Sequence, residues 1–573
     1  MHAFDLKLLN RFNALAKPYW HSDEKWRAHA LIFLLLLLLI SETWLNVQFN
    51  TQSAEFTSAL AGLDAPRFWM SIRTFVLLLI VAVPVYSYYY YVRDKLTINW
   101  RLWLTRRLLS QYLERRSFYH LLQNSEIDNP DQRIAEDISS FTQQSIILAL
   151  VFANALFQLF AFSRVLWSIS QMLVLIVTLY AAVGTAITFG VFGKEMASLY
   201  FDKRKREANF RFGLVRIREH AESIALYRGE KQEQSELEKI FREVVSNFNR
   251  LIDWTLRLNF FHYFYRLLTA LLPALVIAPR VLSGELEVGS IVQVEGACAA
   301  ILGALTVFAD NLESLSSFAA CVDRLDSFSQ CITPAQAPAA PERSRILARD
   351  TGQLSFANVT LMTPNYARTV VKNLTISVPP GNGLMIIGAS GCGKSSLLRL
   401  ISGLWDSGTG TIERPRPEEM LFLPQHAYMI AGSLRRQLCY PHLDRTVSAE
   451  EIHEVLRRVN LSGLVQRCGG LDAEFDFEME ISTGERQRLA FARAFLNRPR
   501  YLLLDEATSA LDQENEASIY SQLAATSCTL ISVSHHPALE KYHSQVLELA
   551  PGGAWRLRPA VKSDAPESGA SLA

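Results

Sequence analysis

The chain has 573 residues, of which 50% are hydrophobic, and its formal net charge is +1. A chain of this length is too long for one hydrophobic core, so at least two domains are expected. The nearly neutral charge excludes the bulk polycation that is typical of nucleic-acid-binding proteins, and no nucleic-acid partner is predicted.

Long apolar runs fill the first three hundred residues. The stretch HALIFLLLLLLISETWLNV at 29–47 can cross a bilayer, which requires roughly 20 mainly apolar residues. Similar runs predict five further spans, at 71–91, 145–165, 171–193, 264–282 and 291–309. The last run contains Glu295 and many small residues, and a buried helix is its alternative interpretation. The lipid bilayer is therefore an expected partner of this half of the chain.

Basic residues are concentrated in alternate connections between the spans. The segments before the first span, after the second and after the fourth are rich in Lys and Arg, whereas 48–66, 166–170 and 283–290 are poor in them. The positive-inside rule then predicts a multi-pass protein with both termini in the cytoplasm. The long charged segments 93–144 and 194–257 have helical periodicity, and we expect them to extend the membrane helices.

Composition also predicts the domain boundaries. We expect an amphipathic N-terminal helix along the inner membrane face, a six-helix membrane domain, a Pro/Ala-rich linker, a soluble α/β domain and a disordered tail. Their predicted bounds are 1–28, 29–328, 329–350, 351–558 and 559–573. The seven cysteines show neither a CxxC pair nor a metal spacing, and they are predicted to be reduced thiols.

The soluble domain opens with a phosphate-binding loop. GLMIIGASGCGKSSLLRL is a short apolar strand, a glycine-rich turn and a helix, which is the context that a nucleotide P-loop requires. Lys394 is expected to reach the β- and γ-phosphates of a nucleotide, and the Ser395 hydroxyl is expected to bind Mg²⁺. The predicted nucleotide-binding residues of the loop are Gly388, Ala389, Ser390, Gly391, Cys392, Gly393, Lys394, Ser395 and Ser396.

Two further strands end in residues that carry chemistry. The apolar run in RYLLLDEATSALD (500–512) ends at Asp505, a predicted Mg²⁺ ligand, and Glu506, which is placed to orient or deprotonate an attacking water. The strand in CTLISVSHH (528–536) ends at His535, which we expect to contact the γ-phosphate. A lone histidine is more often structural, so this prediction depends on its position after a strand, and His536 is the weaker candidate.

A second anion site is predicted at 481–488, ISTGERQR. Small hydroxyl residues stand where a helix begins, and the free N–H groups and the dipole of a helix start favour an anion. One chain therefore carries two separated places for a phosphate.

Together, GASGCGKSS, LPQ, ISTGERQR, YLLLDEATSALD and SVSHH resemble the nucleotide-binding domain of ABC transporters over nearly all of 350–555. The resemblance implies ATP and Mg²⁺ as cofactors, with Gln425 as a catalytic and Mg²⁺-sensing residue beside Glu506 and His535. It also implies that each ATP lies between two subunits, which predicts a homodimer. The implied signature and D-loop residues that complete the partner's site are Ser482, Thr483, Gly484, Glu485 and Asp512.

Two positions depart from that pattern. Thr483 stands where glycine is usual, and a β-branched residue there could slow hydrolysis. The aromatic residue that stacks on adenine in the family would fall near Thr363, which cannot stack, and Tyr366 is a possible substitute.

Further motifs narrow the resemblance. IDNPDQRIAEDI (127–138), EANFRFGLVRIREHAESIALYRGEKQE (207–233) and FLPQHAYMIAGSLRRQLCYP (422–441) are similar to SbmA/BacA-type and YddA-like bacterial transporters and to the peroxisomal D-type acyl-CoA transporters. This implies an all-α membrane domain of the type IV, exporter-like fold, followed by an α/β P-loop ATPase. For Glu295, lining a translocation cavity and pairing with a neighbour remain alternatives.

The sequence thus predicts an ATP-driven transporter of a bacterial cytoplasmic membrane. The SbmA/BacA likeness implies import of a bulky solute such as a peptide or cobalamin. Export of lipids or hydrophobic compounds, and transport of acyl-CoA or long-chain fatty acids, are the alternatives. A regulator without transport activity is disfavoured because Glu506 and His535 are both present.

Overall fold

The computed structural model describes residues 6–123, 129–332 and 344–561. The chain divides into two compact units, residues 1–338 and 339–573. Residues 333–343 of the predicted linker and 562–573 of the predicted tail lie outside the described residues. At the two ends of the linker the described residues belong to regular elements, because a helix continues to Ile332 and a strand occupies Leu347–Asp350.

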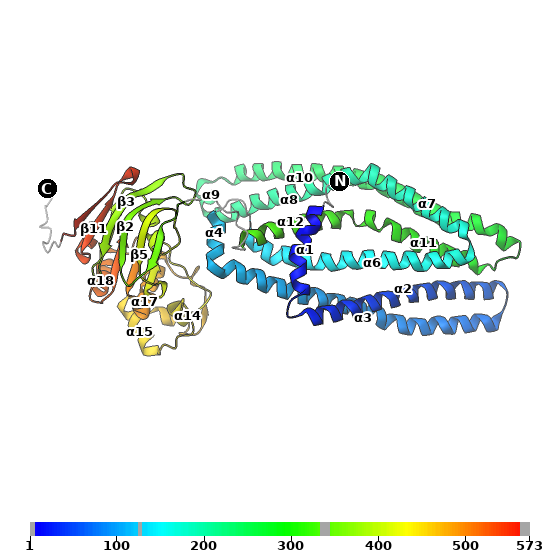
Figure 1. Cartoon of the computed structure of the whole chain (residues 1–573), viewed down its shortest axis with the longest axis horizontal. Coiled ribbons are helices and arrows are strands. Elements are labelled where there is room, and N and C mark those ends of the chain that lie inside the picture. The colour runs from blue at the N-terminus through cyan, green and yellow to red at the C-terminus, as the bar shows by residue number, and fades with distance from the viewer. Residues whose placement is uncertain (1–5, 124–128, 333–343, 562–573) are drawn as a thin grey trace. The chain divides into compact units, whose positions relative to one another are not determined.

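The first unit is helical throughout its described residues (Figure 1). Its elements are α1 (Leu6–Trp20), α2 (Lys25–Ala61), α3 (Ala65–Leu113), η1 (Glu114–Arg116), α4 (Ser117–Gln123), α5 (Pro130–Gln132), the π-helical turn η2 (Arg133–Asp137), α6 (Ile138–Ile169), α7 (Gln171–Ile187), the π-helical turn η3 (Thr188–Gly193), α8 (Lys194–Glu219), α9 (Ala221–Tyr227), α10 (Glu230–Leu282), α11 (Gly289–Asp310) and α12 (Leu312–Ile332).

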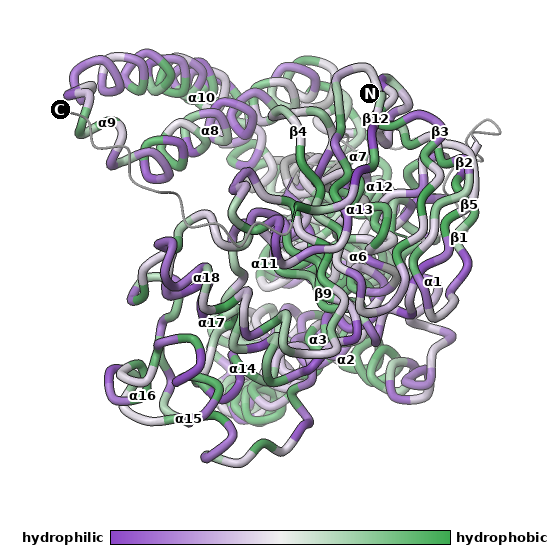
Figure 2. The backbone as a smooth tube through the Cα atoms, turned by 90° about the vertical axis from the view of Figure 1, so that its left-hand side faces the viewer, coloured by the Kyte–Doolittle hydropathy of each residue, from purple (hydrophilic) through white to green (hydrophobic). Residues whose placement is uncertain are grey.

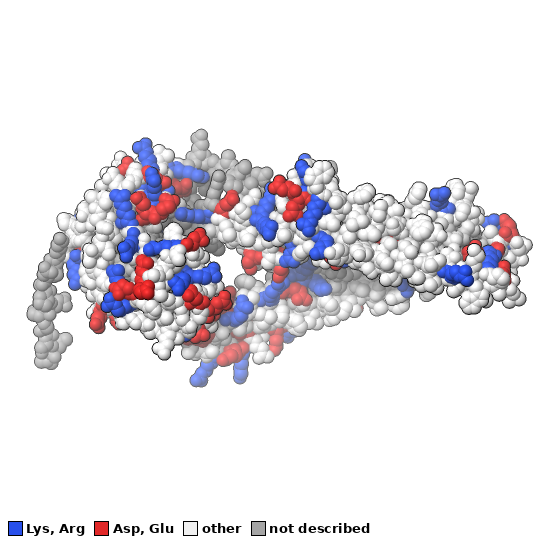
Figure 3. Space-filling view, turned by 90° about the horizontal axis from the view of Figure 1, so that it is seen from below, with Lys and Arg blue, Asp and Glu red and all other residues white. Residues whose placement is uncertain are grey.

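Six of the described helices are long and apolar enough to cross a membrane, which confirms the predicted number of spans. On the face shown in Figure 3, a long stretch of this unit carries few charged side chains, and charges gather again at the end formed by the helical turns. The long charged segments also continue the membrane helices as predicted, since α7, η3 and α8 form one helix from Gln171 to Glu219. Figure 2 shows that α8 and α10 become mostly hydrophilic next to α9.

The turns at that charged end are tied together by Arg67. Its guanidinium lies 2.8 Å from a carboxylate oxygen of Glu55 on α2 and 2.9 Å from one of Glu287, in the turn before α11. Next to this cluster, the N–H of Gly289 donates to the Ser58 hydroxyl at 3.0 Å. A Cβ at Gly289 would lie 2.0 Å from the Ala54 carbonyl oxygen, so only glycine permits this approach of α11 to α2.

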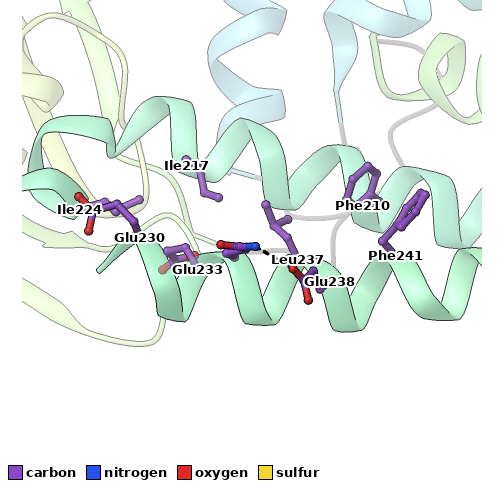
Figure 4. Close-up of a pocket in the computed structure, with 9 residues that line it drawn as sticks. Phe210, Ile217, Ile224, Glu230, Glu233, Leu237, Glu238 and Phe241 are labelled. Atoms are coloured by element: carbon purple, nitrogen blue, oxygen red, sulfur yellow. Dashed lines mark hydrogen bonds between the residues drawn. The ribbon is translucent and has the colours of Figure 1, made fainter. Parts of the chain in front are cut away.

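The hairpin of α8 and α10 contains a cavity of about 380 Å³ near α9 (Figure 4). Phe210 and Phe241 lie at one end of it, and Ile224 lies at the other. Glutamates of α10, including Glu233, which pairs with Arg216 at 2.7 Å, contribute to the lining. Glutamates of α10 therefore border an apolar gap, while most other charged side chains of the hairpin are exposed.

The second unit is built on three sheets. The largest has six strands in the order β12-β11-β4-β10-β9-β6, and all of its neighbouring strands are parallel except β11 and β12. A four-stranded sheet has the order β1-β5-β2-β3, and β7 pairs with β8 in the third sheet. The strands are β1 (Leu347–Asp350), β2 (Leu354–Met362), β3 (Thr369–Val378), β4 (Leu384–Gly388), β5 (Gly408–Arg414), β6 (Met420–Leu423), β7 (Gly432–Ser433), β8 (Glu474–Phe475), β9 (Tyr501–Asp505), β10 (Thr529–Val533), β11 (Gln545–Leu549) and β12 (Trp555–Pro559).

The helices of this unit are α13 (Lys394–Ile401), η4 (Pro417–Glu419), α14 (Leu434–Cys439), α15 (Ala449–Arg458), α16 (Leu464–Arg467), α17 (Thr483–Asn497), α18 (Gln513–Ala524), η5 (Pro537–Tyr542) and η6 (Pro551–Gly553). The central strands β4, β9 and β10 are buried almost throughout, as their continuous apolar runs predict for a parallel sheet covered on both faces. No disulfide joins the cysteines of the described residues.

Candidate nucleotide-binding site

The predicted phosphate loop joins β4 to α13. Gly388, Gly391 and Gly393 have φ values of +148°, +75° and +107°, which L side chains rarely adopt. A Cβ at Gly393 would also lie 2.0 Å from Cγ1 of Val370. Glycine is therefore required for the loop to turn into the helix, and the turn leaves the first N–H groups of α13 without helical partners.

Lys394 is the first residue of α13, and its side chain bends back into the loop. The side chain is buried, and its ammonium donates to the carbonyl oxygens of Gly388 at 2.9 Å and Ala389 at 3.2 Å. A buried ammonium beside free helical N–H groups concentrates positive potential, which is the environment that a polyphosphate needs. The loop residues thus fit the phosphates of ATP.

Ser395 and Asp505 meet beneath this loop. The Ser395 hydroxyl donates to Asp505 Oδ1 at 2.9 Å, and burial raises the pKa of the Asp505 carboxyl while the hydrogen bond from Ser395 opposes that rise. A hydroxyl and a carboxylate are the hard oxygen donors that Mg²⁺ prefers. The described residues contain no cluster of three His, Cys, Asp or Glu side chains that could hold a metal ion. Mg²⁺ commonly binds to one or two protein oxygens together with phosphate oxygens, and Ser395 and Asp505 could supply them.

Glu506, Gln425 and His535 come together because three parallel strands end at one edge of the sheet. In the register, Val533 on β10 pairs with Asp505, and Leu423 on β6 pairs with Leu504. Each candidate follows its strand by one or two residues, so all three side chains emerge at the same edge.

The contacts of Glu506 follow from that register. Its backbone has φ +49°, an uncommon left-handed value for a non-glycine residue, and its N–H donates to the Val533 carbonyl at 3.0 Å. The Gln425 amide donates to Glu506 Oε2 at 3.2 Å, and His535 Nε2 lies 3.3 Å from Oε1. The carboxylate is thereby held between an amide and an imidazole, and it remains partly exposed.

His536 has different contacts from those of His535. Its Nδ1 lies 2.9 Å from Oε2 of Glu516, a buried carboxylate that also accepts a hydrogen bond from the Thr508 hydroxyl at 2.6 Å. Glu516 therefore links the segment after β9 to the segment after β10. Glu516 was not predicted from the sequence, because it lies on α18 and is acidic like many exposed helix positions.

The second predicted anion site lies at the start of α17. Ser482 is the N-cap residue: its hydroxyl accepts from the Glu485 N–H at 3.2 Å, and Glu485 Oε2 accepts from the Ser482 N–H at 2.9 Å. This capping box was readable from the spacing of serine and glutamate. Thr483 is the first helical residue and is exposed, so its backbone needs no glycine. Gly484 lies against Ala510, where a Cβ would be 2.9 Å from the carbonyl oxygen.

Asp512 also caps a helix. It is the N-cap residue of α18, and its carboxylate accepts from the Asn515 N–H at 2.8 Å. Among the described residues, no hydrogen bond or ion pair joins Asp512 or the segment 482–485 to the phosphate loop. The chain therefore presents the two anion sites separately.

Gln487 connects the segments around the site. This side chain is 2% exposed; its amide donates to the Gln425 carbonyl at 3.1 Å and to the Ser509 hydroxyl at 3.2 Å, and it accepts from the Ala510 N–H at 3.0 Å. Tyr366, the candidate adenine contact, is half-buried with φ +59°, and its hydroxyl donates to the Ser344 carbonyl at 2.9 Å.

Comparisons with known proteins agree with this geometry. A family model described as ABC transporter transmembrane region 2 matches residues 15–282, and one described as ABC transporter matches residues 371–509. The chain is 41% identical to an uncharacterized ABC transporter ATP-binding protein of Synechocystis sp., over 94% of this chain and 82% of the relative.

Two eukaryotic proteins are similar over most of their length. ABC transporter D family member 2, chloroplastic, of Arabidopsis thaliana is 35% identical over 96% of this chain and 87% of its own. The lysosomal cobalamin transporter ABCD4 of Homo sapiens is 30% identical over 96% of both chains. The likeness thus covers the membrane helices as well as the soluble unit.

Proposed function

Since the chain belongs to the D-type branch of the ABC transporter family, we propose that it is a homodimeric half-transporter of a bacterial cytoplasmic membrane. It binds ATP through its ABC domain, and ATP hydrolysis is coupled to transport. The proposed catalytic residue is Glu506, and the observation that carries this assignment is its contact with Gln425 and His535 beside the Ser395–Asp505 pair.

In this mechanism Lys394 and the N–H groups of the phosphate loop bind the β- and γ-phosphates. Ser395, Asp505 and Gln425 would hold Mg²⁺, which neutralises charge on the phosphate oxygens. The Glu506 carboxylate orients the attacking water and accepts its proton, because it is the partly exposed carboxylate at this edge. His535 donates to Glu506 or to the γ-phosphate, and so fixes the position of the carboxylate relative to the water.

The separation of the two anion sites supports the proposed dimer. Residues 482–485 lie at the start of α17, at the positive end of its dipole, and no hydrogen bond or ion pair joins them to the phosphate loop within the described part of the same chain. A symmetric pair in which each α17 start faces the partner's phosphate loop would complete two identical sites. Ser482, Thr483, Gly484, Glu485 and Asp512 are then proposed to act on the nucleotide of the partner.

The proposed cargo is a bulky solute, peptide-like or cobalamin-like, that moves into the cytoplasm. Support comes from the human relative, which is a lysosomal cobalamin transporter, and from the resemblance of sequence motifs to SbmA/BacA-type proteins. Export of a lipid or hydrophobic compound and transport of an acyl-CoA or long-chain fatty acid are the alternative outcomes of the transport test. Both termini are proposed to be cytoplasmic, because the connections rich in Lys and Arg lie on their side.

Catalysis is tested with the full chain reconstituted in nanodiscs. Glu506→Gln should lower the ATPase kcat by at least about 100-fold while ATP binding persists, since loss of a general base costs about 10²- to 10⁴-fold. Glu514→Gln, at an exposed position on α18, is the matched control and should retain wild-type turnover. Wild-type turnover by Glu506→Gln would refute the assignment.

The composite site is tested by complementation. Lys394→Ala and Ser482→Arg chains, each inactive alone, are co-assembled and purified through two different tags. The mixed dimer has one site with both defects and one intact site, so it should recover activity. An inactive mixed dimer would contradict sites shared between chains. Direction is read from ATP-driven accumulation of labelled cobalamin or peptide in right-side-out and inside-out vesicles.

A further inference from the structure

A cavity with both polar and apolar residues in its lining lies between two membrane-crossing helices of the helical unit. It has a volume of about 560 Å³ and is lined by residues of α10 and α11. Both helices are among those long and apolar enough to span a bilayer. A volume of this size suits one polar group of a larger solute, because ligand pockets commonly measure about 300–1,000 Å³.

The α10 wall is polar and positively charged. Asn259, His262, Arg266 and Thr269 recur every three or four residues, so they share one face of the helix. The Arg266 guanidinium lies over the Tyr263 ring, 5.0 Å from its centroid, and remains exposed. Within the described residues, neither Arg266 nor His262 forms an ion pair with an acidic side chain.

The α11 wall carries one carboxylate above small residues. Glu295, Ala299 and Gly303 follow each other at four-residue intervals, and they line the cavity. A Cβ at Gly303 would meet no atom within 4 Å, so the cavity is open at this position. The adjacent face of α11 is apolar and buried, with Val294 and Cys298 at 0% exposure.

Glu295 is too deep in its span to be a helix-end residue. It lies six positions after Gly289, the first residue of α11, which is about 9 Å of helix. Its side chain is exposed, and no ion pair with it occurs among the described residues. Ionisable residues inside spans are costly, and they usually face a partner or a water-filled cavity. A cavity with Arg266 on one wall and Glu295 on the other satisfies this requirement.

We propose that this cavity binds the transported solute and selects a zwitterionic group. A phosphate or carboxylate pairs with Arg266 and His262, and an ammonium group pairs with Glu295. The inference rests on the proposed transport function and adds to it the charge pattern of the cargo. Two sources offer this chemistry, a zwitterionic lipid headgroup and a soluble peptide with free termini.

The probes separate these sources. The full chain is placed in nanodiscs of phosphatidylglycerol alone, which carries a phosphate but no ammonium. One arm replaces part of that lipid with phosphatidylethanolamine; the other adds trialanine, with N-acetyl-trialanine as the control that lacks the ammonium. The readout is ATPase stimulation relative to the basal rate of each sample, together with trialanine binding. At least about twofold stimulation is expected from phosphatidylethanolamine or from trialanine, and from neither control.

Substitutions in both walls test the proposal. Gly303→Leu places a side chain in the cavity, where a Cβ meets no atom within 4 Å, and should abolish stimulation, whereas Gly190→Leu, at another glycine with no atom within 4 Å of its Cβ, should leave it unchanged. Arg266→Glu should raise the concentration of zwitterion needed for half-maximal stimulation about tenfold. The double variant Arg266→Glu/Glu295→Arg should restore part of it, because a zwitterion can bind in the reversed orientation.

The outcomes distinguish the two proposals. Stimulation by phosphatidylethanolamine supports a lipid headgroup, and stimulation by trialanine supports a soluble solute. No response to either zwitterion, or a wild-type response in Gly303→Leu, overturns the cavity proposal while the basal ATPase rate of the wild type still tests the transporter. A wild-type protein without basal ATPase activity would instead contradict the proposed function.

Discussion

Tyr180 on α7 and Tyr265 on α10 are joined by two reciprocal hydrogen bonds and by ring stacking. Each hydroxyl donates a 2.8 Å hydrogen bond to the backbone carbonyl of the other residue, and the rings stack with centroids 4.2 Å apart and an interplanar angle of 1°. Tyr265 also lines the cavity between α10 and α11. The pair therefore fixes α7 against α10 and keeps one part of the cavity wall in place.

Removal of one hydroxyl should loosen this pair measurably. Tyr180→Phe and Tyr265→Phe keep the stacked rings and each lose one hydrogen bond, which is worth about 0.5–1.5 kcal/mol of unfolding free energy. Thermal unfolding of the full chain in detergent should show a lower midpoint for each variant. Tyr88→Phe, at a position 61% exposed, is the control. Midpoints equal to that of Tyr88→Phe would show that the hydrogen bonds contribute nothing.

Gly184 makes the stacking of this pair possible. A Cβ there would lie 2.4 Å from Cζ of Tyr265, a ring already held flat against Tyr180. Gly184→Ala should therefore displace the ring and cost about 1–3 kcal/mol, the usual range for overpacking. Gly190→Ala adds the same methyl group where no atom lies within 4 Å, and it should be neutral. Equal unfolding midpoints for the two alanine variants would refute the clash.

Local patterns predicted much of the structure. Apolar runs located the six spans, and the strand–glycine turn–helix order located the phosphate loop, because each pattern depends on neighbouring residues. Asp505, Glu506 and His535 were found from their positions after strands. Their meeting with Gln425 requires the strand order β10-β9-β6, which local periodicity does not determine.

Contacts between residues far apart in the chain could not be predicted from the sequence. Tyr180 and Tyr265 are 85 positions apart, and neither differs in its local pattern from an interfacial tyrosine. Glu295 was noticed as an acidic residue in a span, but its relation to Arg266 depends on the rotation of two helices about their axes. The contacts of Glu516 with His536 likewise depend on how α18 packs beside β10, and hydropathy carries no information about that contact.

Gln487 should act as a positioning residue for hydrolysis. Gln487→Ala leaves the Ala510 N–H and the Gln425 carbonyl without this partner, so the segment that carries Gln425 loses its tie to α17. We expect kcat to fall about tenfold, which corresponds to about 1.4 kcal/mol, with the Kd for ATP changed less than about twofold. Steady-state kinetics and nucleotide binding measure the two effects separately.

The control for Gln487 is Gln513→Ala, at an exposed position at the start of α18. The conservative variant Gln487→Glu keeps the acceptor for Ala510 and should retain more activity than Gln487→Ala. Parallel losses of ATP affinity and kcat would indicate general destabilisation, and they would contradict a positioning role.

His543 should make the second unit sensitive to acid. It is 2% exposed; its Nδ1–H donates to the Leu539 carbonyl at 2.9 Å and the Ser532 hydroxyl donates to Nε2 at 2.8 Å, so the ring is neutral. Burial lowers its pKa to about 4. An unfolded histidine has a pKa of about 6.5, so between these values only the unfolded chain binds the proton. The stabilisation is complete above about pH 6.5, and about 2 kcal/mol of it is lost by about pH 5.

The test compares thermal unfolding at about pH 7.5 and about pH 5. The unfolding temperature of His543→Gln should fall less between these two pH values than that of the wild type, whereas the exposed His453→Gln should respond like the wild type. An acid response of His543→Gln as large as that of His453→Gln would exclude His543 as the cause.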